Sequence, residues 1–160
     1  MSETVLPPRS IIVVQHLAAA GADVDVRVLP DSARTAAQAA EAIGCEVAAI
    51  ANSLVLVADG EPILVMTSGG HRVDLDVLRE SIGADDVAMA PASVVREATG
   101  QAIGGVAPVG HPAPLRTYID VALSDHAEIW AAAGHPHTVM PLTFELLRTL
   151  TSGAVVAVAN

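Results

Sequence analysis

The chain has 160 residues, the length of one domain with its own hydrophobic core, and we expect a single domain over residues 1–160. Its formal net charge is −10, and all eight basic side chains are arginines. So acidic a chain repels nucleic-acid phosphates at long range, and only 2% of its residues are aromatic and able to stack on bases. The composition disfavours non-specific nucleic-acid binding, and DNA is not an expected partner.

Cys45 is the single cysteine, so no disulfide can form within the chain, and we expect a cytoplasmic protein. The first residues lack the pattern of a signal peptide, and no apolar run approaches the roughly 20 residues that span a bilayer. No membrane partner is therefore expected. Cys45 follows Gly44, and we interpret it as a small core residue rather than a nucleophile.

The first half of the chain predicts two helices, a strand and a hairpin. Apolar periodicity and glycine stops predict a helix over residues 10–20 and another from Thr35 to Gly44, where Thr35 and Gln38 form a capping-box signature. Alternating polar and apolar residues predict a strand over 23–29. Two apolar runs on either side of Asp59 and Gly60 predict a β-hairpin.

The second half continues the mixture of helices and strands. Residues 74–82 and 91–99 are predicted helices separated by a short strand over 87–89, and the segment 100–114 is rich in glycine and proline and predicts a loop. Strands are then expected at 117–123, 128–133 and 138–140, a helix at 143–150 and a final strand at 154–159. This irregular order predicts an α/β fold of the α+β type, with a mixed, curved or barrel-like sheet flanked by helices.

The segment GGVAPVGHP, residues 104–112, contains three glycines spaced around a proline. Such a segment lets the backbone approach a ligand closely and directs several N–H groups at one point, which stabilises an oxyanion or binds a carboxylate or phosphate. The alternative is a tight structural turn. The glycine spacing is not that of a Walker or dinucleotide-binding loop, and no lysine follows.

His135 and His137 are two residues apart, so on a strand both imidazoles would face the same side. They could then act as a general base or as a metal pair. No third ligand has motif spacing nearby, and Asp120, Asp125 and His126 qualify only if the fold brings them close. The alternative is a loop or surface pair.

Asn52 and Ser53 stand at the start of an apolar strand. Polar residues in this position often mark the rim of a pocket, but they are as often simple strand-entry residues. Ser53 lacks the G-x-S-x-G context of a nucleophile elbow.

In their order, these segments resemble the YbaK/prolyl-tRNA-synthetase-associated aminoacyl-tRNA editing domain family along nearly the whole chain. The glycine-proline loop together with the later AGHPH segment carries most of the specificity of the resemblance. The similar segments are DVDVRVLP, RTAAQAAEAIGC, IANSLVLV, PILVMTSGGHRVDLDVLRESIG, ATGQAIGGVAPVGHP, TYIDVAL and AAGHPHTVMPLTFELLRTLTSG.

The resemblance implies hydrolysis of the ester between a mischarged amino acid and the 3′ adenosine of tRNA, without a metal, cofactor or protein nucleophile. It implies that backbone amides of the glycine loop contact the substrate carbonyl. The expected catalytic residues are Asn52, Gly104, Gly105, Gly110 and His135, and the expected substrate-binding residues are Ser53, Val106, Pro108, His111, Asp120 and His137. We expect substitutions at Gly105 or Gly110 to damage activity more than stability.

Many family members carry a lysine in the segment that here reads AIANSLVL, and the resemblance places Asn52 at that position. Asparagine offers a neutral donor and acceptor in place of a compact positive charge. Either Asn52 binds the substrate differently, with His135 or His137 compensating, or the deacylase activity is altered or absent.

Three functions follow from these patterns. The first is a free-standing aminoacyl-tRNA deacylase whose partners are the acceptor end of a mischarged tRNA and, as an open alternative, a synthetase that delivers it. The second is a non-catalytic module that binds an amino acid or small carboxylate, which suits the acidic charge. The third is a metal-dependent hydrolase centred on His135 and His137.

Overall fold

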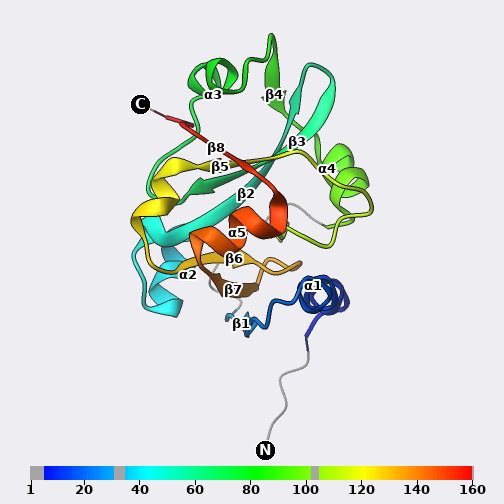
Figure 1. Ribbon diagram of the computed structural model, residues 1–160. Coiled ribbons are helices and arrows are strands. Elements are labelled where there is room, and N and C mark those ends of the chain that lie inside the picture. Colours follow the sequence, from blue (N-terminus) through cyan, green and yellow to red (C-terminus); the bar gives the residue numbers. More distant parts are fainter. Residues whose placement is uncertain (1–5, 31–34, 102–104, 160) are drawn as a thin grey trace, which may run out of the picture.

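The computed structural model describes residues 6–30, 35–101 and 105–159 (Figure 1). The helices are α1 (Pro8–Ala19), α2 (Ala36–Ile43), α3 (Leu75–Ile82), α4 (Ala92–Thr99) and α5 (Phe144–Thr151), with short 3-10 helices η1 (Val47–Ala49) and η2 (Val121–Asp125). The strands are β1 (Arg27–Val28), β2 (Ile50–Ala58), β3 (Glu61–Ser68), β4 (Val87–Met89), β5 (Thr117–Asp120), β6 (Ile129–Ala132), β7 (Thr138–Leu142) and β8 (Ala154–Val156).

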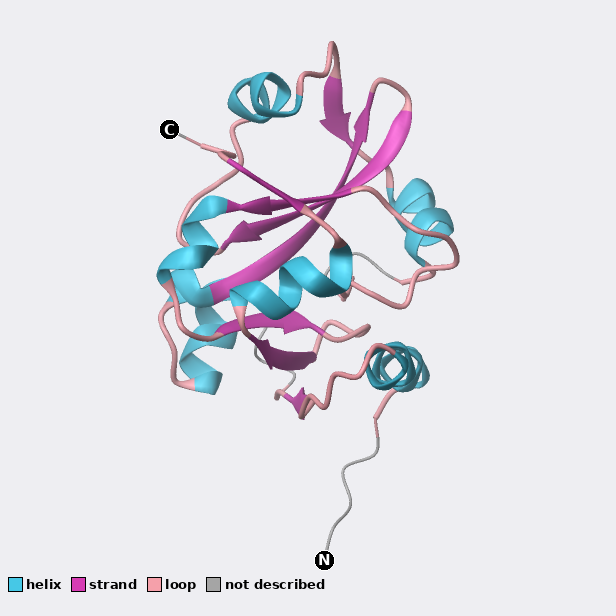
Figure 2. Ribbon diagram, in the orientation of Figure 1, coloured by secondary structure: helices cyan, strands magenta, loops and turns pink. Residues whose placement is uncertain are grey.

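Within the described residues the strands form one sheet in the order β1-β7-β6-β2-β3-β5-β8, with β4 also paired to β2. The β2–β3, β2–β4, β6–β7 and β1–β7 pairs are antiparallel, whereas β2–β6, β3–β5 and β5–β8 are parallel. β6 pairs with the start of β2 and β4 with its end, so both share one edge of this long central strand. The sheet runs through the middle of the molecule with helices around it (Figure 2).

Alternation along the strands divides the core between the two faces of the sheet. On one face, residues of α1, α4 and α5 pack with β-strand residues such as Val55, Met66 and Met140 in the largest buried cluster. On the other face, α2 packs over Ile50 and Trp130, and α3 packs over a separate cluster that includes Leu56. The predicted α/β class, with a mixed sheet flanked by helices, is confirmed.

Four predicted strands are shorter than the sequence indicates. The strand expected over 128–133 is β6 (Ile129–Ala132), and the final strand, expected over 154–159, ends at Val156. The strand expected over 23–29 is reduced to β1, because only Arg27 and Val28 pair with β7 and the residues before them make no ladder. The strand expected over 117–123 ends at Asp120, whose carboxylate accepts a hydrogen bond from the amide of Ala122 at 3.0 Å. This bond caps η2, so the chain turns into a 3-10 helix where a strand was expected.

The local signals for helix ends and for the hairpin are confirmed. Thr35 and Gln38 exchange both hydrogen bonds of the capping box, at 3.1 Å each, and Gly44 ends α2 in the left-handed conformation. Asp59 and Gly60 connect β2 to β3 with φ angles of +50° and +85°, as a type I′ hairpin turn requires.

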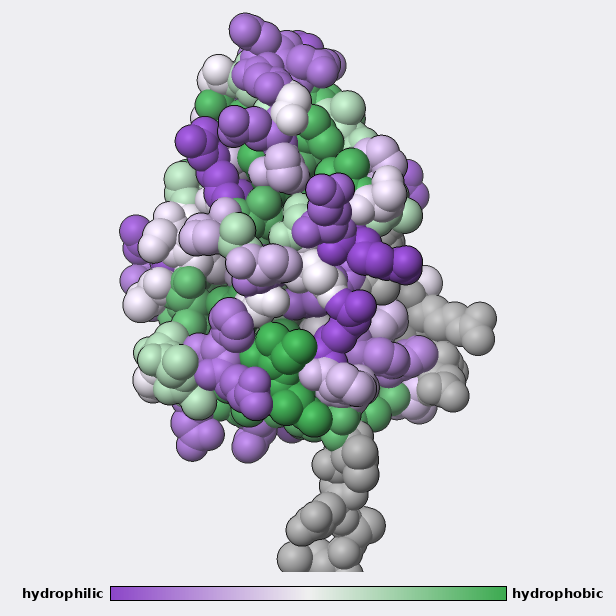
Figure 3. Space-filling view, turned by 90° about the vertical axis from the view of Figure 1, so that its right-hand side faces the viewer, coloured by the Kyte–Doolittle hydropathy of each residue, from purple (hydrophilic) through white to green (hydrophobic). Residues whose placement is uncertain are grey.

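Part of the surface remains apolar. On the face seen in Figure 3, hydrophobic side chains gather in the lower middle of the view and polar side chains surround them. The exposed large apolar residues include Ile11 and Ile12 on α1. Across the described ranges, no helix combines the length and the apolar character that a membrane crossing requires.

Asp59 gives the first testable prediction, because its carboxylate accepts hydrogen bonds from the amides of Asp85 and Asp86 at 2.8 to 3.3 Å. Asp59→Ala removes these bonds and places alanine in a left-handed conformation. We expect a loss of about 1–3 kcal/mol in the free energy of unfolding, measured by urea denaturation.

Asp59→Asn is the matched control, since asparagine keeps an acceptor oxygen and tolerates positive φ. It should lose less than half as much stability as the alanine variant. Equal losses in the two variants would contradict this role of the side chain.

Candidate functional site

A cavity of about 690 Å³ opens on the face of the sheet that α2 and α3 cover. Its volume falls in the range of about 300–1,000 Å³ that is common for small-molecule sites. Apolar residues such as Ile50, Leu54, Trp130 and Val139 make up most of its walls. The polar residues that line it are Thr35, Asn52, Ser53, Thr67, His71, Arg72 and Thr138.

Asn52 lies in the β2 wall of this cavity, between the two apolar clusters of this face. Ile50 belongs to the cluster under α2 and Leu56 to the cluster under α3. The β2–β3 register pairs Asn52 with Thr67, and side chains directly opposite in an antiparallel pair lie on the same face. Among the described residues no group hydrogen-bonds to the Asn52 side-chain amide, which leaves it available to a ligand.

Ser53 also borders the cavity, but its hydroxyl is used elsewhere. It donates to the sulfur of Met66 at 3.2 Å, and Met66 belongs to the core cluster on the opposite face. Alternation along β2 accounts for this, because successive side chains point to opposite faces.

The glycine-rich segment meets the cavity at its N-terminal part. Gly105 and Val106 are buried, and Val106 lines the cavity, whereas Gly104 lies outside the described residues. A Cβ on Gly105 would lie 2.7 to 2.8 Å from backbone atoms of His135 and Pro136. Gly105 is therefore the point where the glycine segment packs against the turn between β6 and β7.

The middle of the segment is fixed by Gln101. The amide of Ala107 donates to Gln101 Oε1 at 2.6 Å, and Gln101 Nε2 donates to the carbonyl of Val109 at 3.2 Å. Pro108 is buried between these two bonds and does not line the cavity. The amide of Ala107 therefore already has a hydrogen-bond partner within the protein and is not available to a ligand.

Gly110 and His111 lie at a second hollow, beside α1, and not at the cavity of Asn52. Gly110 has a φ of +87°, and a Cβ there would meet Gln101 and Val13. His111 Nε2 bonds to the carbonyl of Ala107 at 2.8 Å, and burial lowers the pKa of its imidazole. The two ends of the predicted loop are therefore separated in space.

His135 and His137 occupy a turn and not a strand, because β6 ends at Ala132 and β7 begins at Thr138. The amide of His137 donates to His135 Nδ1 at 3.2 Å, and the ring centroids are 5.6 Å apart. The intervening Pro136 lines the cavity, and the two histidines themselves do not. In the described part of the chain no three histidine, cysteine or acidic side chains gather as a metal site.

Cys45 is partly buried and packs against the cluster under α2. Burial raises the pKa of its thiol, which disfavours the nucleophilic thiolate. This environment agrees with the interpretation of Cys45 as a core residue.

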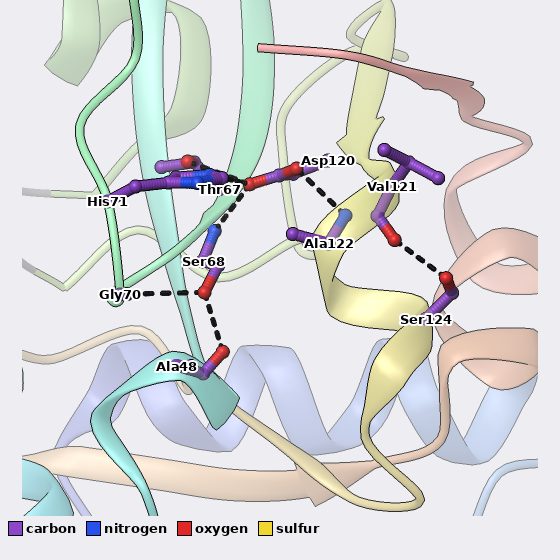
Figure 4. A network of polar contacts seen from close by, with 9 residues as sticks. All are labelled: Ala48, Thr67, Ser68, Gly70, His71, Asp120, Val121, Ala122 and Ser124. Atoms are coloured by element: carbon purple, nitrogen blue, oxygen red, sulfur yellow. Dashed lines mark hydrogen bonds and ion pairs between the residues drawn. The ribbon is translucent and has the colours of Figure 1, made fainter. Parts of the chain in front are cut away.

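The structure adds a histidine to the site. His71 lines the cavity, and its Nε2 lies 2.5 Å from Oδ2 of Asp120 (Figure 4). Asp120 itself lies behind the wall, only 1% exposed, and also accepts hydrogen bonds from Thr67 and Ser68. Because 49 residues separate His71 from Asp120, the only sequence signal was a histidine directly after Gly69 and Gly70 at a strand end.

One arginine lines the cavity, and a second contacts a tryptophan that lines it. Arg72 lines it, and the guanidinium of Arg27 lies 4.8 Å from the ring centroid of Trp130, another lining residue. This is within the distance of a cation–π contact. Among the described residues, Arg72 thus brings a positive charge to the cavity wall, and Arg27 lies behind the ring of one wall residue.

Together these features define a mixed α/β protein whose apolar cavity carries uncharged polar groups and a histidine–carboxylate pair. The aminoacyl-tRNA editing domain matches residues 30–150 of this sequence. The chain belongs to this family, and the resemblance inferred from the sequence is confirmed. Membership supports a role in aminoacyl-tRNA editing.

Individual relatives agree with this assignment. The uncharacterized protein YwhH of Bacillus subtilis (strain 168) is 33% identical over 120 residues, which are 74% of this chain and 76% of that protein. The proline–tRNA ligase of Citrifermentans bemidjiense is 32% identical over 81 residues, 51% of this chain but only 14% of the ligase. A crystal structure of a proposed trans-editing enzyme for prolyl tRNA synthetase has a TM-score of 0.92 and 39% identity, covering 98% of this chain and 99% of that chain.

The sequence alone predicts that substitution of Gly105 damages activity more than stability, but its close packing in the structure predicts a loss of stability as well. In Gly105→Ala the new methyl group overlaps the backbone of His135 and Pro136. We expect a loss of about 1–3 kcal/mol in the free energy of unfolding, measured by urea denaturation. A loss below about 0.5 kcal/mol, the range of ordinary surface substitutions, would contradict this packing role.

His111 predicts a pH dependence of folding. Burial lowers the pKa of His111 below its ordinary value of 6.5, so below pH 6.5 the unfolded chain binds a proton that the folded chain does not. This histidine therefore lowers the free energy of unfolding as the pH falls from 7.5 to 5.5.

His111→Gln keeps a donor for the carbonyl of Ala107 but does not titrate. Urea denaturation at pH 7.5 and 5.5 should show a smaller decrease in the variant than in the wild type. An equal decrease in both proteins would show that His111 contributes nothing to the pH dependence.

Proposed function

We propose that this protein is a free-standing aminoacyl-tRNA deacylase that hydrolyses the ester of a mischarged amino acid on tRNA. The observation that carries the proposal is the cavity that Asn52, Thr67 and Val106 line together. Membership in the editing family and the likeness to a proposed trans-editing enzyme for prolyl tRNA synthetase support it. Translation takes place in the cytoplasm, where such an enzyme would act, and we treat residues 1–160 as one editing domain.

The walls of the cavity suit the amino-acid part of such a substrate. Apolar residues line most of it, and α2 contributes only the small side chains of Ala36 and Ala39. An apolar pocket discriminates between near-isosteric amino acids by only about 10–200-fold, which is why synthetases need a second site that removes errors. A small apolar amino acid is the substrate class that fits.

In the proposed complex, the backbone amides of Gly105 and Val106, with Gly104 as their neighbour in sequence, polarise the ester carbonyl. Asn52 orients the substrate through its free side-chain amide. His135 contributes mainly as the backbone on which Gly105 packs. Gly110 and His111 are excluded from the proposed site because they lie at the second hollow beside α1.

The acceptor end of tRNA would meet the rim of the cavity. Arg72 and Arg27 supply local positive charge in a chain of net charge −10. Local contacts of this kind bind one tRNA end without general affinity for nucleic acid. A synthetase that delivers the tRNA would reduce the affinity that the protein itself must provide.

A second candidate function is a non-catalytic module that binds an amino acid in the same cavity. Asn52 favours it, because an uncharged amide replaces the lysine of many family members. A neutral hydrogen bond is roughly half as strong as a charge-assisted one, so the site stabilises developing negative charge less.

A deacylation assay tests the proposal. The protein is incubated with alanyl- and cysteinyl-tRNA for proline, together with other mischarged pairs and correctly charged prolyl-tRNA. We expect hydrolysis of at least one mischarged pair above the buffer blank. Asn52→Ala should lower kcat/KM about tenfold, which is the loss of one hydrogen bond of about 1.4 kcal/mol.

Gln15→Ala is the control, because it removes the same amide group from an exposed position on α1. It should leave the rate unchanged. If the wild type hydrolyses none of the tested aminoacyl-tRNAs faster than the buffer blank, the deacylase proposal fails. A thermal shift with free amino acids in that inactive protein would then favour the binding module.

A further inference from the structure

We propose that His71 is the general base of the hydrolysis, with Asp120 as its positioning residue; this inference rests on the proposed function. Among the described residues that line the cavity, His71 is the one histidine, and a neutral imidazole has a ring nitrogen that can accept a proton. Arg72 is the other ionisable lining residue, and a guanidinium does not act as a base.

Asp120 fixes the orientation of the imidazole. The carboxylate is 1% exposed, and its oxygens accept hydrogen bonds from Thr67 Oγ1 at 3.2 Å, from the amides of Ser68 and Ala122 at 2.9 and 3.0 Å, and from His71 Nε2 (Figure 4). A buried charge with so many donors is held in one place. Because Nε2 donates to Asp120, the neutral ring has its acceptor at Nδ1.

The backbone that carries His71 is fixed as well. The hydroxyl of Ser68 donates to the carbonyl of Ala48 at 2.6 Å and accepts from the amide of Gly70 at 3.2 Å. A Cβ on Gly69 would lie 2.6 Å from the carbonyl oxygen of Val47. The turn from β3 therefore packs directly on η1, which limits the positions that the imidazole can take.

The pair lies next to the proposed substrate site. Thr67, which shares Oδ2 of Asp120 with His71, is the cross-strand partner of Asn52. The side chain of His71 is 34% exposed, so water in the cavity has access to the ring. His135 is less suited to act as the base, because it does not line the cavity and its Nδ1 accepts a hydrogen bond from the amide of His137 within the turn.

Water is the only co-reactant that this hydrolysis requires. The oxygen of a water molecule attacks the carbonyl carbon of the ester while Nδ1 of His71 takes one of its protons. The bond between the carbonyl carbon and the ribose oxygen then breaks, and the imidazolium returns the proton to that oxygen. The products are the free amino acid and a tRNA with its terminal hydroxyl restored. General bases of this kind accelerate reactions by about 10²–10⁴-fold.

The test compares His71→Gln and His71→Ala with the wild type in single-turnover deacylation from pH 5.5 to 8, with the blank subtracted at each pH. Glutamine can still donate to Asp120 but cannot take a proton. The ionisable groups around His71 are Asp120 on β5, Arg72 beside it and Asp74 at the start of α3. His16→Gln on the exposed surface of α1 is the matched control.

We expect His71→Gln to lower the rate constant at least 100-fold, with little change in KM, and to have a blank-corrected rate that depends less on pH than the wild-type rate does. Added imidazole should restore part of the activity of His71→Ala, which a merely structural role would not allow. Asp120→Asn should lower the rate constant while KM stays nearly constant, because the ring loses its orienting partner.

Circular dichroism and thermal unfolding establish that each variant is folded. If the wild type is active and the rate constant of His71→Gln lies within threefold of the wild-type value, the role of His71 is overturned but the proposed function is not. The same conclusion follows if added imidazole restores no activity to a folded His71→Ala. A wild type that hydrolyses none of the tRNAs would overturn the proposed function and this role with it.

Discussion

β2 and β3 pair from Ala51–Ser68 to Ala58–Glu61, and this register places Asn52 opposite Thr67 on one face of the sheet. A slip of β3 by one residue would turn Thr67 to the opposite face, into the largest apolar cluster, and separate it from Asn52. The tight turn at Asp59 and Gly60 leaves no room for such a slip. The polar groups of the cavity, and through Thr67 the carboxylate of Asp120, depend on this pairing.

The cavity exists because the helices on this face cover only the two ends of β2. α2 packs over Ile50 and α3 over the cluster of Leu56, so the sheet between them stays open to a ligand. On the opposite face, α1, α4 and α5 contribute to one large cluster, which keeps the strands fixed. A rigid sheet with one partly covered face suits the deacylase that we propose, which would position its substrate without forming a covalent adduct with it.

The charge of the molecule separates two tasks that a tRNA-dependent hydrolase must perform. A net charge of −10 works against general binding of RNA, while Arg72 lines the cavity and Arg27 contacts the lining residue Trp130. Behind the cavity wall, the carboxylate of Asp120 is buried and accepts hydrogen bonds from Thr67, Ser68 and Ala122. For the deacylase that we propose, specificity for one tRNA end would depend on local contacts and on any partner that delivers the substrate.

The sequence by itself determined the fold class, the capped helix after Thr35 and the hairpin at Asp59, because these follow from periodicity and turn residues. The editing family followed from the resemblance of the segments in their order. It also singled out Asn52 and the glycine segment. Only the tertiary structure separated Gly110 and His111 from the cavity, moved His135 and His137 into a turn, and brought His71 to Asp120. Those outcomes depend on contacts between residues far apart in the chain, and local sequence patterns carry no information about such distances.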